Sequence, residues 1–260
     1  MSKINPSATI TGRGGKEKLL AALIAPFTVG FGLMWCLSCG LILVSLPGLQ
    51  NRRRFARRAA RGLLRLLGLR WTINGSDRIP SGACVVVANH ASYLDGVILT
   101  ALLPPHFAFV IKKDMASVPL AGLLLRRLDS LFVEHKQPNR REDSRRLLEH
   151  TAAGDALGIF PEGTFKPTPG LLPFRSGAFV TATRANVPVL PITLHGSRRA
   201  MPAASLCPLP GRLTLDIHRP INPGGKERRH RVDLEIRSRK AILSTLDEPD
   251  LNPSSASTDT

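Results

Sequence analysis

Apolar and polar positions follow two different rhythms along residues 71–247. Short runs rich in Val, Ile, Leu and Phe predict β-strands, and the segments between them repeat apolar residues at helical spacing, which predicts helices. The predicted strands are Trp71–Asn74, Ala83–Ala88, Phe107–Ile111, Leu131–Glu134, Leu157–Phe160, Val187–Leu194 and Leu213–His218. The predicted helices are Ser92–Leu102, Leu120–Leu128, Glu142–Ala153, Ser176–Asn186 and Arg229–Leu246. This alternation indicates an α/β fold in which helices flank both faces of a mostly parallel sheet.

The N-terminal part of the chain has a different pattern, because no charged residue occurs from Leu19 to Asn51. These 51 − 18 = 33 residues are mostly apolar and exceed the ~20 that a helix needs to cross a bilayer. We expect residues 19–50 to form a retained hydrophobic membrane anchor, because Pro47 and a run of arginines follow in place of a small-residue cleavage site. Pro26 and several glycines interrupt the stretch, so one tilted span and two shorter re-entrant helices are both open.

Arginines dominate the residues that follow the apolar stretch. Residues 51–70 contain eight of them, at positions 52, 53, 54, 57, 58, 61, 65 and 70, with Phe55, Ala59, Leu63 and Leu66 at helical spacing. This pattern predicts a basic amphipathic helix on an anionic lipid surface. The basic N-terminal segment 1–18 carries fewer positive charges. Because the more positive flank of a membrane span stays in the cytoplasm, we expect the protein in the cell inner membrane with residues 71–247 on the cytoplasmic face.

The charge balance favours lipid over nucleic acid as the partner. The 260 residues include 36 Lys and Arg against 19 Asp and Glu, which gives a formal net charge of +17. A nucleic-acid-binding protein would share this charge, but the sequence has no nucleic-acid-binding motif and its arginines adjoin the apolar stretch. With 43% hydrophobic residues, the chain is also too apolar for a disordered polycation. We therefore expect membrane lipids, and no nucleic acid, as partners.

Cysteine usage and the C-terminal composition complete the domain organisation. The four cysteines are too scattered for a disulfide framework, and Cys36 and Cys39, although spaced as C-x-x-C, have no second Cys or His pair at ligand spacing. We therefore expect a reducing compartment and no metal site. Residues 248–260 are rich in Ser, Thr, Asn and Pro, which predicts a disordered tail outside the folded domain 71–247.

The first candidate for chemistry directly follows the predicted strand Ala83–Ala88. The apolar end of this strand fits a buried central position, and ligands in such folds collect at the carboxyl ends of the strands. Ser92-x-x-Asp95 resembles a capping box, which would start the next helix at Ser92 and let Asp95 reach back to the ring of His90. A carboxylate on one ring nitrogen makes the other a better proton acceptor. We expect His90 to be a general base that Asp95 orients.

The same spacing occurs once more, at His150 and Asp155. This second pair follows a charged helical segment that ends at Gly154, so it is most simply a histidine at a helix C-terminus with an aspartate in the turn. The spacing alone therefore does not identify a catalytic pair, and a structural helix cap is also open for His90 and Asp95. Their place directly after a buried strand favours chemistry.

The second candidate, Phe160-Pro161-Glu162-Gly163-Thr164, also follows an apolar strand. Glu162 and Thr164 supply an acceptor and a donor there, and Gly163 lets the backbone approach a ligand; a turn with a solvated glutamate is the alternative. Arg175 precedes the predicted helix Ser176–Asn186, where a guanidinium and a helix N-terminus could bind a phosphate together, with a plain surface arginine as the alternative. We expect Glu162, Gly163, Thr164 and Arg175 to bind substrate.

Together these residues resemble the glycerolipid acyltransferase family, typified by bacterial 1-acylglycerol-3-phosphate acyltransferases. The resemblance spans about Asn74 to Leu251 and rests on two motifs that occur in the family's order. One is Asn89-His90 with four residues to Asp95, and the other is Phe160-Pro161-Glu162-Gly163-Thr164. The stretch Val187-Pro188-Val189-Leu190-Pro191-Ile192 is similar to a further family block.

The resemblance implies transfer of a fatty acyl group from acyl-CoA or acyl carrier protein to the free hydroxyl of 1-acylglycerol-3-phosphate. It implies His90 as the base, Asp95 as its orienting partner and no resident cofactor, because the acyl carrier is a co-substrate. It also implies no acyl-enzyme. The sequence agrees with this, since it has no G-x-S-x-G nucleophile elbow and no cysteine beside a histidine.

Two departures from the family leave the acceptor open. The family usually has Arg at the end of its second block and after Glu-Gly-Thr, where this chain has His135 and Phe165. Arg175 is the best remaining contact for an acceptor phosphate. The alternative acceptors are a lyso-ornithine lipid or another lysophospholipid, and the alternative class of protein is a non-catalytic membrane scaffold.

Overall fold

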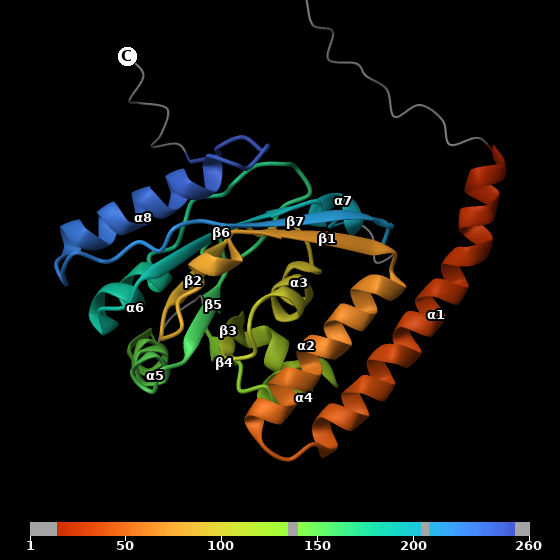
Figure 1. The fold of residues 1–260 in the computed structure, drawn as a ribbon, viewed down its shortest axis with the longest axis horizontal. Coiled ribbons are helices and arrows are strands. Elements are labelled where there is room, and N and C mark those ends of the chain that lie inside the picture. The colour runs from red at the N-terminus through yellow and green to blue at the C-terminus, as the bar shows by residue number, and fades with distance from the viewer. Residues whose placement is uncertain (1–14, 135–139, 204–207, 253–260) are drawn as a thin grey trace, which may run out of the picture.

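The computed structural model describes residues 15–134, 140–203 and 208–252, and its centre is a seven-stranded sheet (Figure 1). The strands are β1 (Leu69–Asn74), β2 (Val85–Ala88), β3 (Phe107–Lys112), β4 (Leu131–Val133), β5 (Ala156–Ile159), β6 (Val189–His195) and β7 (Gly211–Ile217). Their order is β1-β7-β6-β2-β5-β3-β4, and neighbouring strands are parallel except for β6 and β7. The predicted mostly parallel sheet is therefore confirmed, and each predicted strand is present.

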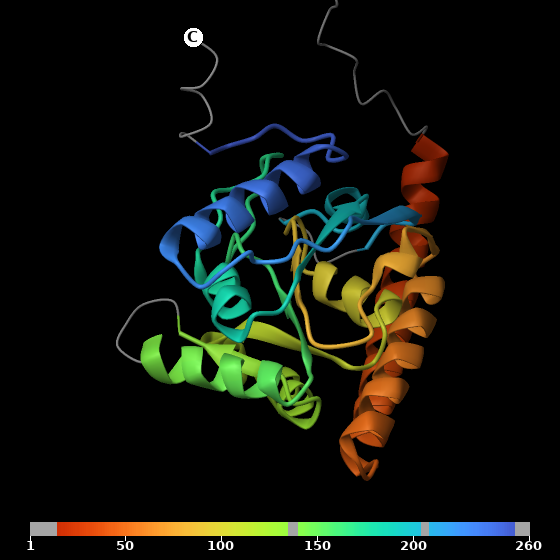
Figure 2. The same cartoon turned by 60° about the vertical axis from the view of Figure 1, so that its left-hand side comes forward.

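Helices cover both faces of this sheet. They are α1 (Gly15–Ser45), α2 (Leu49–Leu66), α3 (Asp95–Leu102), α4 (Ala121–Arg127), α5 (Arg140–Ala152), α6 (Gly177–Ala185), α7 (Ser197–Ala200) and α8 (Arg228–Leu243), with short 3-10 helices η1 (Ser76–Arg78) and η2 (Lys113–Ser117). Figure 2 shows α5, α6 and α8 on one side of the sheet and α2, with α1 outside it, on the other. The predicted helices of the folded domain correspond to α3, α4, α5, α6 and α8. The sequence pattern did not predict α7 or the two 3-10 helices.

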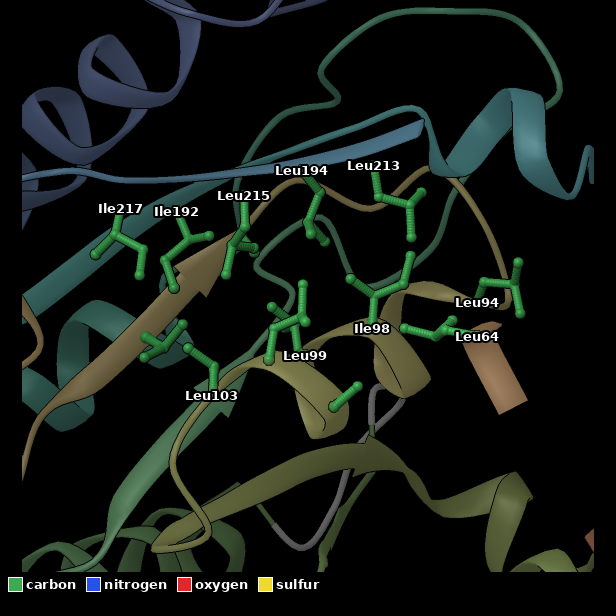
Figure 3. Packing of buried hydrophobic residues seen from close by; sticks show 14 of the residues in the cluster. Leu64, Leu94, Ile98, Leu99, Leu103, Ile192, Leu194, Leu213, Leu215 and Ile217 are labelled. Carbon is green, nitrogen blue, oxygen red and sulfur yellow. The ribbon is translucent and has the colours of Figure 1, made fainter. Parts of the chain in front are cut away.

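The central strand β2 explains why both faces are covered. All four of its residues are fully buried, and they alternate between two apolar clusters. Val86 and Ala88 belong to the cluster on the α3 side, whereas Val85 and Val87 belong to the cluster with α6 and α8. Figure 3 shows the first cluster, where leucines and isoleucines of β6 and β7 pack on α3 and on Leu64 of α2. Because β2 is packed on both sides, its carboxyl end is held in a fixed place.

The helices α1 and α2 form an antiparallel hairpin beside this domain (Figure 1). The ring of Trp35 lies so close to Gly62 that a Cβ at residue 62 would overlap it, and Trp35 Nε1 donates a hydrogen bond to the carbonyl of Ala59 at 3.1 Å. Glycine is needed here because the two helices approach closely. Over the residues that the structure describes, no helix has both the length and the apolar character of a bilayer span.

The arginines of α2, the segment that we predicted as a basic amphipathic helix, do not all face outward. Arg53 is 4% exposed and donates through Nε to the carbonyl of Leu128, just after α4. Arg52 donates to the carbonyl of Arg127 at 2.7 Å, and Arg61 donates to the carbonyl of Ala101 at 2.8 Å, near the end of α3. The last carbonyls of a helix lack partners within it, so these guanidinium groups satisfy the C-termini of α3 and α4. Exposed arginines remain at positions 54, 58, 65 and 70.

The prediction of a disordered tail from residue 248 is wrong for residues 248–252, which pack on the domain. Leu171 and Asp250 form an isolated parallel β-bridge. Glu248 forms an ion pair with Arg198 at 2.7 Å, and Asp250 pairs with Arg239. The polar composition that suggests a tail therefore provides carboxylates for buried and half-buried arginines. Residues 253–260 lie outside the described part of the chain.

Candidate active site

The predicted pairing of His90 and Asp95 is present at the carboxyl end of β2. Nδ1 of His90 lies 2.8 Å from Oδ2 of Asp95, which is completely buried. The same oxygen accepts the backbone N–H groups of Ala91 at 2.6 Å and Ser92 at 2.8 Å. Because Oδ2 already accepts two backbone N–H groups, it acts as an acceptor toward the ring as well, and the ring nitrogen that faces it carries the proton. The lone pair of the imidazole is therefore on Nε2.

The His90 side chain remains 19% exposed, so its ring is partly open to a ligand. Over the described residues, Nε2 has no hydrogen-bond partner within the protein. A neutral imidazole with one nitrogen held by a buried carboxylate and the other open can accept a proton from a bound hydroxyl group. The geometry of the pair thus fits a general base.

The expected capping box is only half formed. Asp95 reaches back to the N–H of Ser92 as predicted, but α3 begins at Asp95 and not at Ser92. The hydroxyl of Ser92 donates to the carbonyl of Met201 at 2.8 Å and accepts from the N–H of Leu94 at 3.2 Å. The hydroxyl of Ser92 therefore does not cap α3. Residues 90–94 form an irregular turn before the helix, and His90 lies at the start of this turn.

Glu162 lies directly beside His90 in space but does not face solvent. It is 4% exposed, and its two carboxylate oxygens accept backbone N–H groups, that of His90 on Oε1 at 2.6 Å and that of Leu172 on Oε2 at 2.7 Å. Burial raises the pKa of Glu162 to about 7, although these two hydrogen bonds and Arg239 favour its ionised form. We predicted a substrate contact at Glu162; the structure gives this carboxylate a role in holding the backbone of the site.

Aromatic rings surround His90, a feature that the sequence analysis missed. The ring of Phe160 stacks on the imidazole with centroids 4.2 Å apart, and Phe165 meets its edge at 4.7 Å. Tyr93, the only tyrosine of the chain, contacts Phe165 in turn at 4.8 Å. The available signal was that these aromatic residues fall within or beside the two motifs of a sequence with only 5% aromatic residues.

The remaining predicted substrate contacts lie on the loop after β5 and at the start of α6. Gly163 adopts a positive φ of 69° and donates its N–H to the carbonyl of Phe160, so it closes the turn. Thr164 is exposed. The N–H of Arg175 donates to the carbonyl of Pro161 at 2.8 Å, which joins Arg175 to the Glu162 motif, and its side chain is exposed beside the first turn of α6. His135 lies outside the described residues.

A further residue, Asn89, positions the site without chemistry of its own. Its side-chain amide donates to the carbonyl of Leu194 at 3.0 Å and accepts the N–H of Leu194 at 2.7 Å. This two-way bond joins the end of β2 to β6 and fixes the residue immediately before His90. Sequence spacing places Asn89 in the motif but does not reveal this partner, which is 105 residues away.

One group of side chains in the described part of the chain has the spacing of a metal site, and it lies before β5, away from His90. Asp129, His150 and Asp155 bring ligand atoms within 4.8 Å of one another. The guanidinium of Arg53 lies in the same cluster, 3.3 Å from Asp155 and 3.6 Å from Asp129. Its positive charge balances the carboxylates and would repel a cation, so this group does not indicate a metal.

The sequence and the fold both resemble known acyltransferases. Residues 70–195 match the sequence profile of the family described as Acyltransferase. A lyso-ornithine lipid O-acyltransferase of Pseudomonas aeruginosa is 31% identical over 185 residues, which cover 71% of this chain and 70% of that protein. A 1-acyl-sn-glycerol-3-phosphate acyltransferase of the same organism is 28% identical over 183 residues, or 70% of each chain.

Two further acyltransferases show how far this similarity extends, one in sequence and one in fold. A chloroplastic 1-acyl-sn-glycerol-3-phosphate acyltransferase of Brassica napus is 34% identical over 153 residues, and the chain spans only 44% of the length of that protein. The crystal structure of a 1-acyl-sn-glycerophosphate acyltransferase from Thermotoga maritima shares the fold, with a TM-score of 0.64 and 23% identity over 87% of this chain and 92% of that one. This chain therefore belongs to the glycerolipid acyltransferase family, a family of O-acyltransferases.

Proposed function

We propose that this protein transfers a fatty acyl group from acyl-CoA or acyl carrier protein to the free hydroxyl of 1-acylglycerol-3-phosphate. The proposal rests on the His90–Asp95 pair at the carboxyl end of β2. Nδ1 of His90 lies 2.8 Å from Oδ2 of Asp95, and the imidazole ring is partly exposed. Relatives that bear this activity in their names add support for the substrate class.

The proposed reaction needs one base and no covalent intermediate on the protein. Nε2 of His90 takes the proton of the acceptor hydroxyl while its oxygen attacks the thioester carbonyl. The tetrahedral intermediate then collapses, the C–S bond breaks, and the imidazolium returns the proton to the leaving thiolate. The products are the diacylated lipid and the free thiol of the carrier. Asp95 stabilises the imidazolium between these two proton transfers.

A cysteine nucleophile would offer a different route, and Cys84 does not suit it. Cys84 is fully buried, and burial raises the pKa of its thiol to about 12, so almost none of it is thiolate at neutral pH. Direct transfer with His90 as the base therefore remains the better account. It uses no resident cofactor.

The acceptor is the finer part of the proposal. Arg175 is the side chain we propose for the acceptor phosphate, because its backbone N–H is bonded to the carbonyl of Pro161 and its side chain is exposed at the surface. A second acceptor, a lyso-ornithine lipid, is favoured by a specific observation. Phe165 packs on the ring of His90 at the position where the family usually has an arginine, and a relative named for that lipid is 31% identical.

We further propose that the protein works at a membrane, with the site on the cytoplasmic side. Apolar side chains are exposed along α1, among them Phe31, Leu37 and Leu41. A second exposed apolar group lies on η2, on α4 and on the short segment between them, and we call it the α4 footing; it consists of Met115, Val118, Leu120 and Leu123. The two surfaces adjoin, since Gly40 of α1 faces Leu124 of α4. Lysines 112 and 113 and the exposed arginines of α2 provide charge for anionic lipid.

The test is an acyl-transfer assay with purified full-length protein in vesicles that contain anionic lipid. Lysophosphatidic acid and lyso-ornithine lipid are offered separately with acyl-CoA or acyl carrier protein, and the products are identified by mass spectrometry. Acylation of lysophosphatidic acid that disappears in His90→Ala supports the main proposal. Acylation of lyso-ornithine lipid alone replaces the acceptor, and no transfer to any lysolipid would favour the scaffold.

A further inference from the structure

The side chain of Arg239 on α8 enters the protein and bonds the loop that follows the Glu162 motif. It is 7% exposed, and it donates to the carbonyls of Leu172 at 2.7 Å and Leu171 at 2.8 Å. Its guanidinium also lies over the ring of Phe174, 4.8 Å from the centroid, and pairs with Asp250. One buried cation thus connects α8, the loop 171–174 and the C-terminal segment.

The C-terminal segment Glu248–Leu251, which we call the C-terminal strap, runs along the same loop. Leu171 donates its N–H to the carbonyl of Pro249 at 2.9 Å and accepts the N–H of Leu251 at 3.0 Å. Glu248 accepts the N–H of Gly170 at 2.7 Å. A Cβ at residue 170 would overlap Leu251, and its φ is 137°, so only glycine lets the strap lie this close.

The loop that the strap holds is bonded to the catalytic histidine through Glu162. Leu172, whose carbonyl Arg239 holds, donates its own N–H to Oε2 of Glu162, and Oε1 of Glu162 accepts the N–H of His90. Three successive contacts therefore connect Arg239 to Leu172, Leu172 to Glu162, and Glu162 to His90. Every link is a hydrogen bond of 2.6–2.7 Å between groups that are buried or partly buried.

We propose that Arg239 and the C-terminal strap are positioning elements for acyl transfer. They hold the backbone of Leu171 and Leu172 where the Leu172 N–H can orient the Glu162 carboxylate, and that carboxylate then fixes the backbone of His90. The inference rests on the proposed role of His90. It gives the final residues of the described chain a part in the reaction, although they touch no substrate.

The charges around Glu162 give this role a distinctive signature. Besides burial, the groups that act on Glu162 are Arg239, which lowers its pKa, and Asp95, which raises it. Its backbone partners Leu172 and His90 also lower it. Loss of the Arg239 charge, together with a loosened Leu172 N–H, therefore raises the pKa of Glu162 further. A neutral Glu162 no longer accepts both N–H groups, so activity is lost on the acidic side of the pH profile.

The experiment compares the pH profile of kcat in the full-length wild type, Arg239→Met and Arg239→Lys. The matched control is Arg237→Met, because Arg237 lies on the same helix but is exposed and pairs only with Asp233 in the described structure. We expect kcat to fall roughly 10- to 100-fold at pH 7 in Arg239→Met, with an acid limb that moves to higher pH and partial recovery at pH 9. Arg239→Lys keeps the charge but loses the fork, so it lowers kcat and moves the limb less than Arg239→Met does. KM for the acceptor stays unchanged.

A folded Arg239→Met variant with the wild-type acid limb and kcat would overturn the proposal. If that variant does not fold, Arg239→Lys decides in its place, and an unchanged kcat there would also overturn it. Amide hydrogen exchange at His90 and Leu172 provides a readout that needs no turnover, and we expect faster exchange at both in Arg239→Lys but not in Arg237→Met. A wild type without acyl transfer would refute the proposed function, while the exchange result would still test the positioning.

Discussion

Nδ1 of His150 lies 3.0 Å from Oδ2 of Asp155. This pair repeats the arrangement of His90 and Asp95, but at the opposite ends of the parallel strands. His90 follows the carboxyl end of β2, whereas Asp155 immediately precedes β5, which runs parallel to β2. Asp155 also receives Arg53 at 3.3 Å, and Asp129 lies nearby. A histidine and an aspartate five residues apart therefore meet in both places, and the surroundings alone distinguish a base from a structural pair.

This comparison leads to the first prediction. His90→Ala should lower acyl transfer by about 10²- to 10⁴-fold, because the general base is lost. His150→Ala should leave transfer nearly unchanged, since its ring serves a cluster before β5. Initial rates of both purified variants, with circular dichroism as a check of folding, measure the difference. Equal losses of activity in the two variants would remove the special role of His90.

The second prediction concerns the pH dependence of stability. The pKa of Glu162 is raised from 4.5 to about 7 in the folded protein, so between these pH values the folded state keeps a proton that the unfolded chain has lost. Its contribution to the free energy of unfolding is therefore greatest below pH 4.5 and disappears as the pH rises through 7. Glu162→Gln does not titrate. We expect the difference in free energy of unfolding, wild type minus Glu162→Gln, to decrease by at most about 3 kcal/mol across this window.

Urea unfolding of both proteins at pH 5 and pH 8 measures that difference. The expected change in this stability difference does not depend on which lipid is the acyl acceptor, because it reflects only the environment of the Glu162 carboxyl group. A difference that stays constant with pH would show that Glu162 keeps its ordinary pKa in spite of its burial.

The third prediction tests the acceptor. Arg175→Lys keeps a positive charge but loses the two-pronged contact, so KM for lysophosphatidic acid should rise while KM for the acyl donor changes little. Arg175→Ala should raise it more, by roughly 10- to 150-fold, as expected for a charge-assisted contact of about 1.5–3 kcal/mol. Steady-state kinetics with each substrate varied in turn provide the measurement. Unchanged acceptor kinetics in Arg175→Ala would favour an acceptor without a phosphate.

The fourth prediction concerns the α4 footing. Leu120 is 41% exposed and Leu123 is 45% exposed, so charged residues at both positions should be tolerated by the fold but not by a lipid surface. We expect Leu120→Glu/Leu123→Glu to reduce partitioning into anionic vesicles by roughly 10-fold or more. Ile236→Glu, on the exposed side of α8, is the matched control. Vesicle sedimentation in which both variants bind equally would contradict a lipid contact at the α4 footing.

The sequence predicts the elements and the contact between His90 and Asp95 well, for a physical reason. The strands of this sheet are short apolar runs, and the motif residues follow directly where β2 and β5 end. Parallel strands bring their carboxyl ends to one edge, so His90 and Glu162 become neighbours once the topology is known. Both the strands and the positions of the motif residues at the strand ends can therefore be predicted from local sequence alone.

Features that depend on distant partners could not be predicted. Arg53 belongs to a run of arginines that looks solvated, and its burial is explained by partners far along the chain, the carbonyl of Leu128 and the carboxylates of Asp129 and Asp155. Glu162 occupies a turn where a glutamate can face either solvent or backbone, and spacing does not distinguish these orientations. Glu248 and Asp250 lie in a polar segment that has no apolar periodicity. Ion pairs with Arg198 and Arg239, and not a hydrophobic face, hold this segment on the domain.

The pairing of β1 with β7 has a consequence for how the protein is made. Asn74 and Asp216, which face each other in this pair, are 142 residues apart in the chain. Strand β1 emerges early from the ribosome, yet its sheet partner is among the last elements to be synthesised. A nascent chain that ends before Gly211 therefore has two unpaired strand edges, on β1 and on β6, which are sites for aggregation. The sheet is completed only when β7 inserts between β1 and β6 and pairs with both of them. The yield of folded protein is therefore sensitive to any premature end of translation.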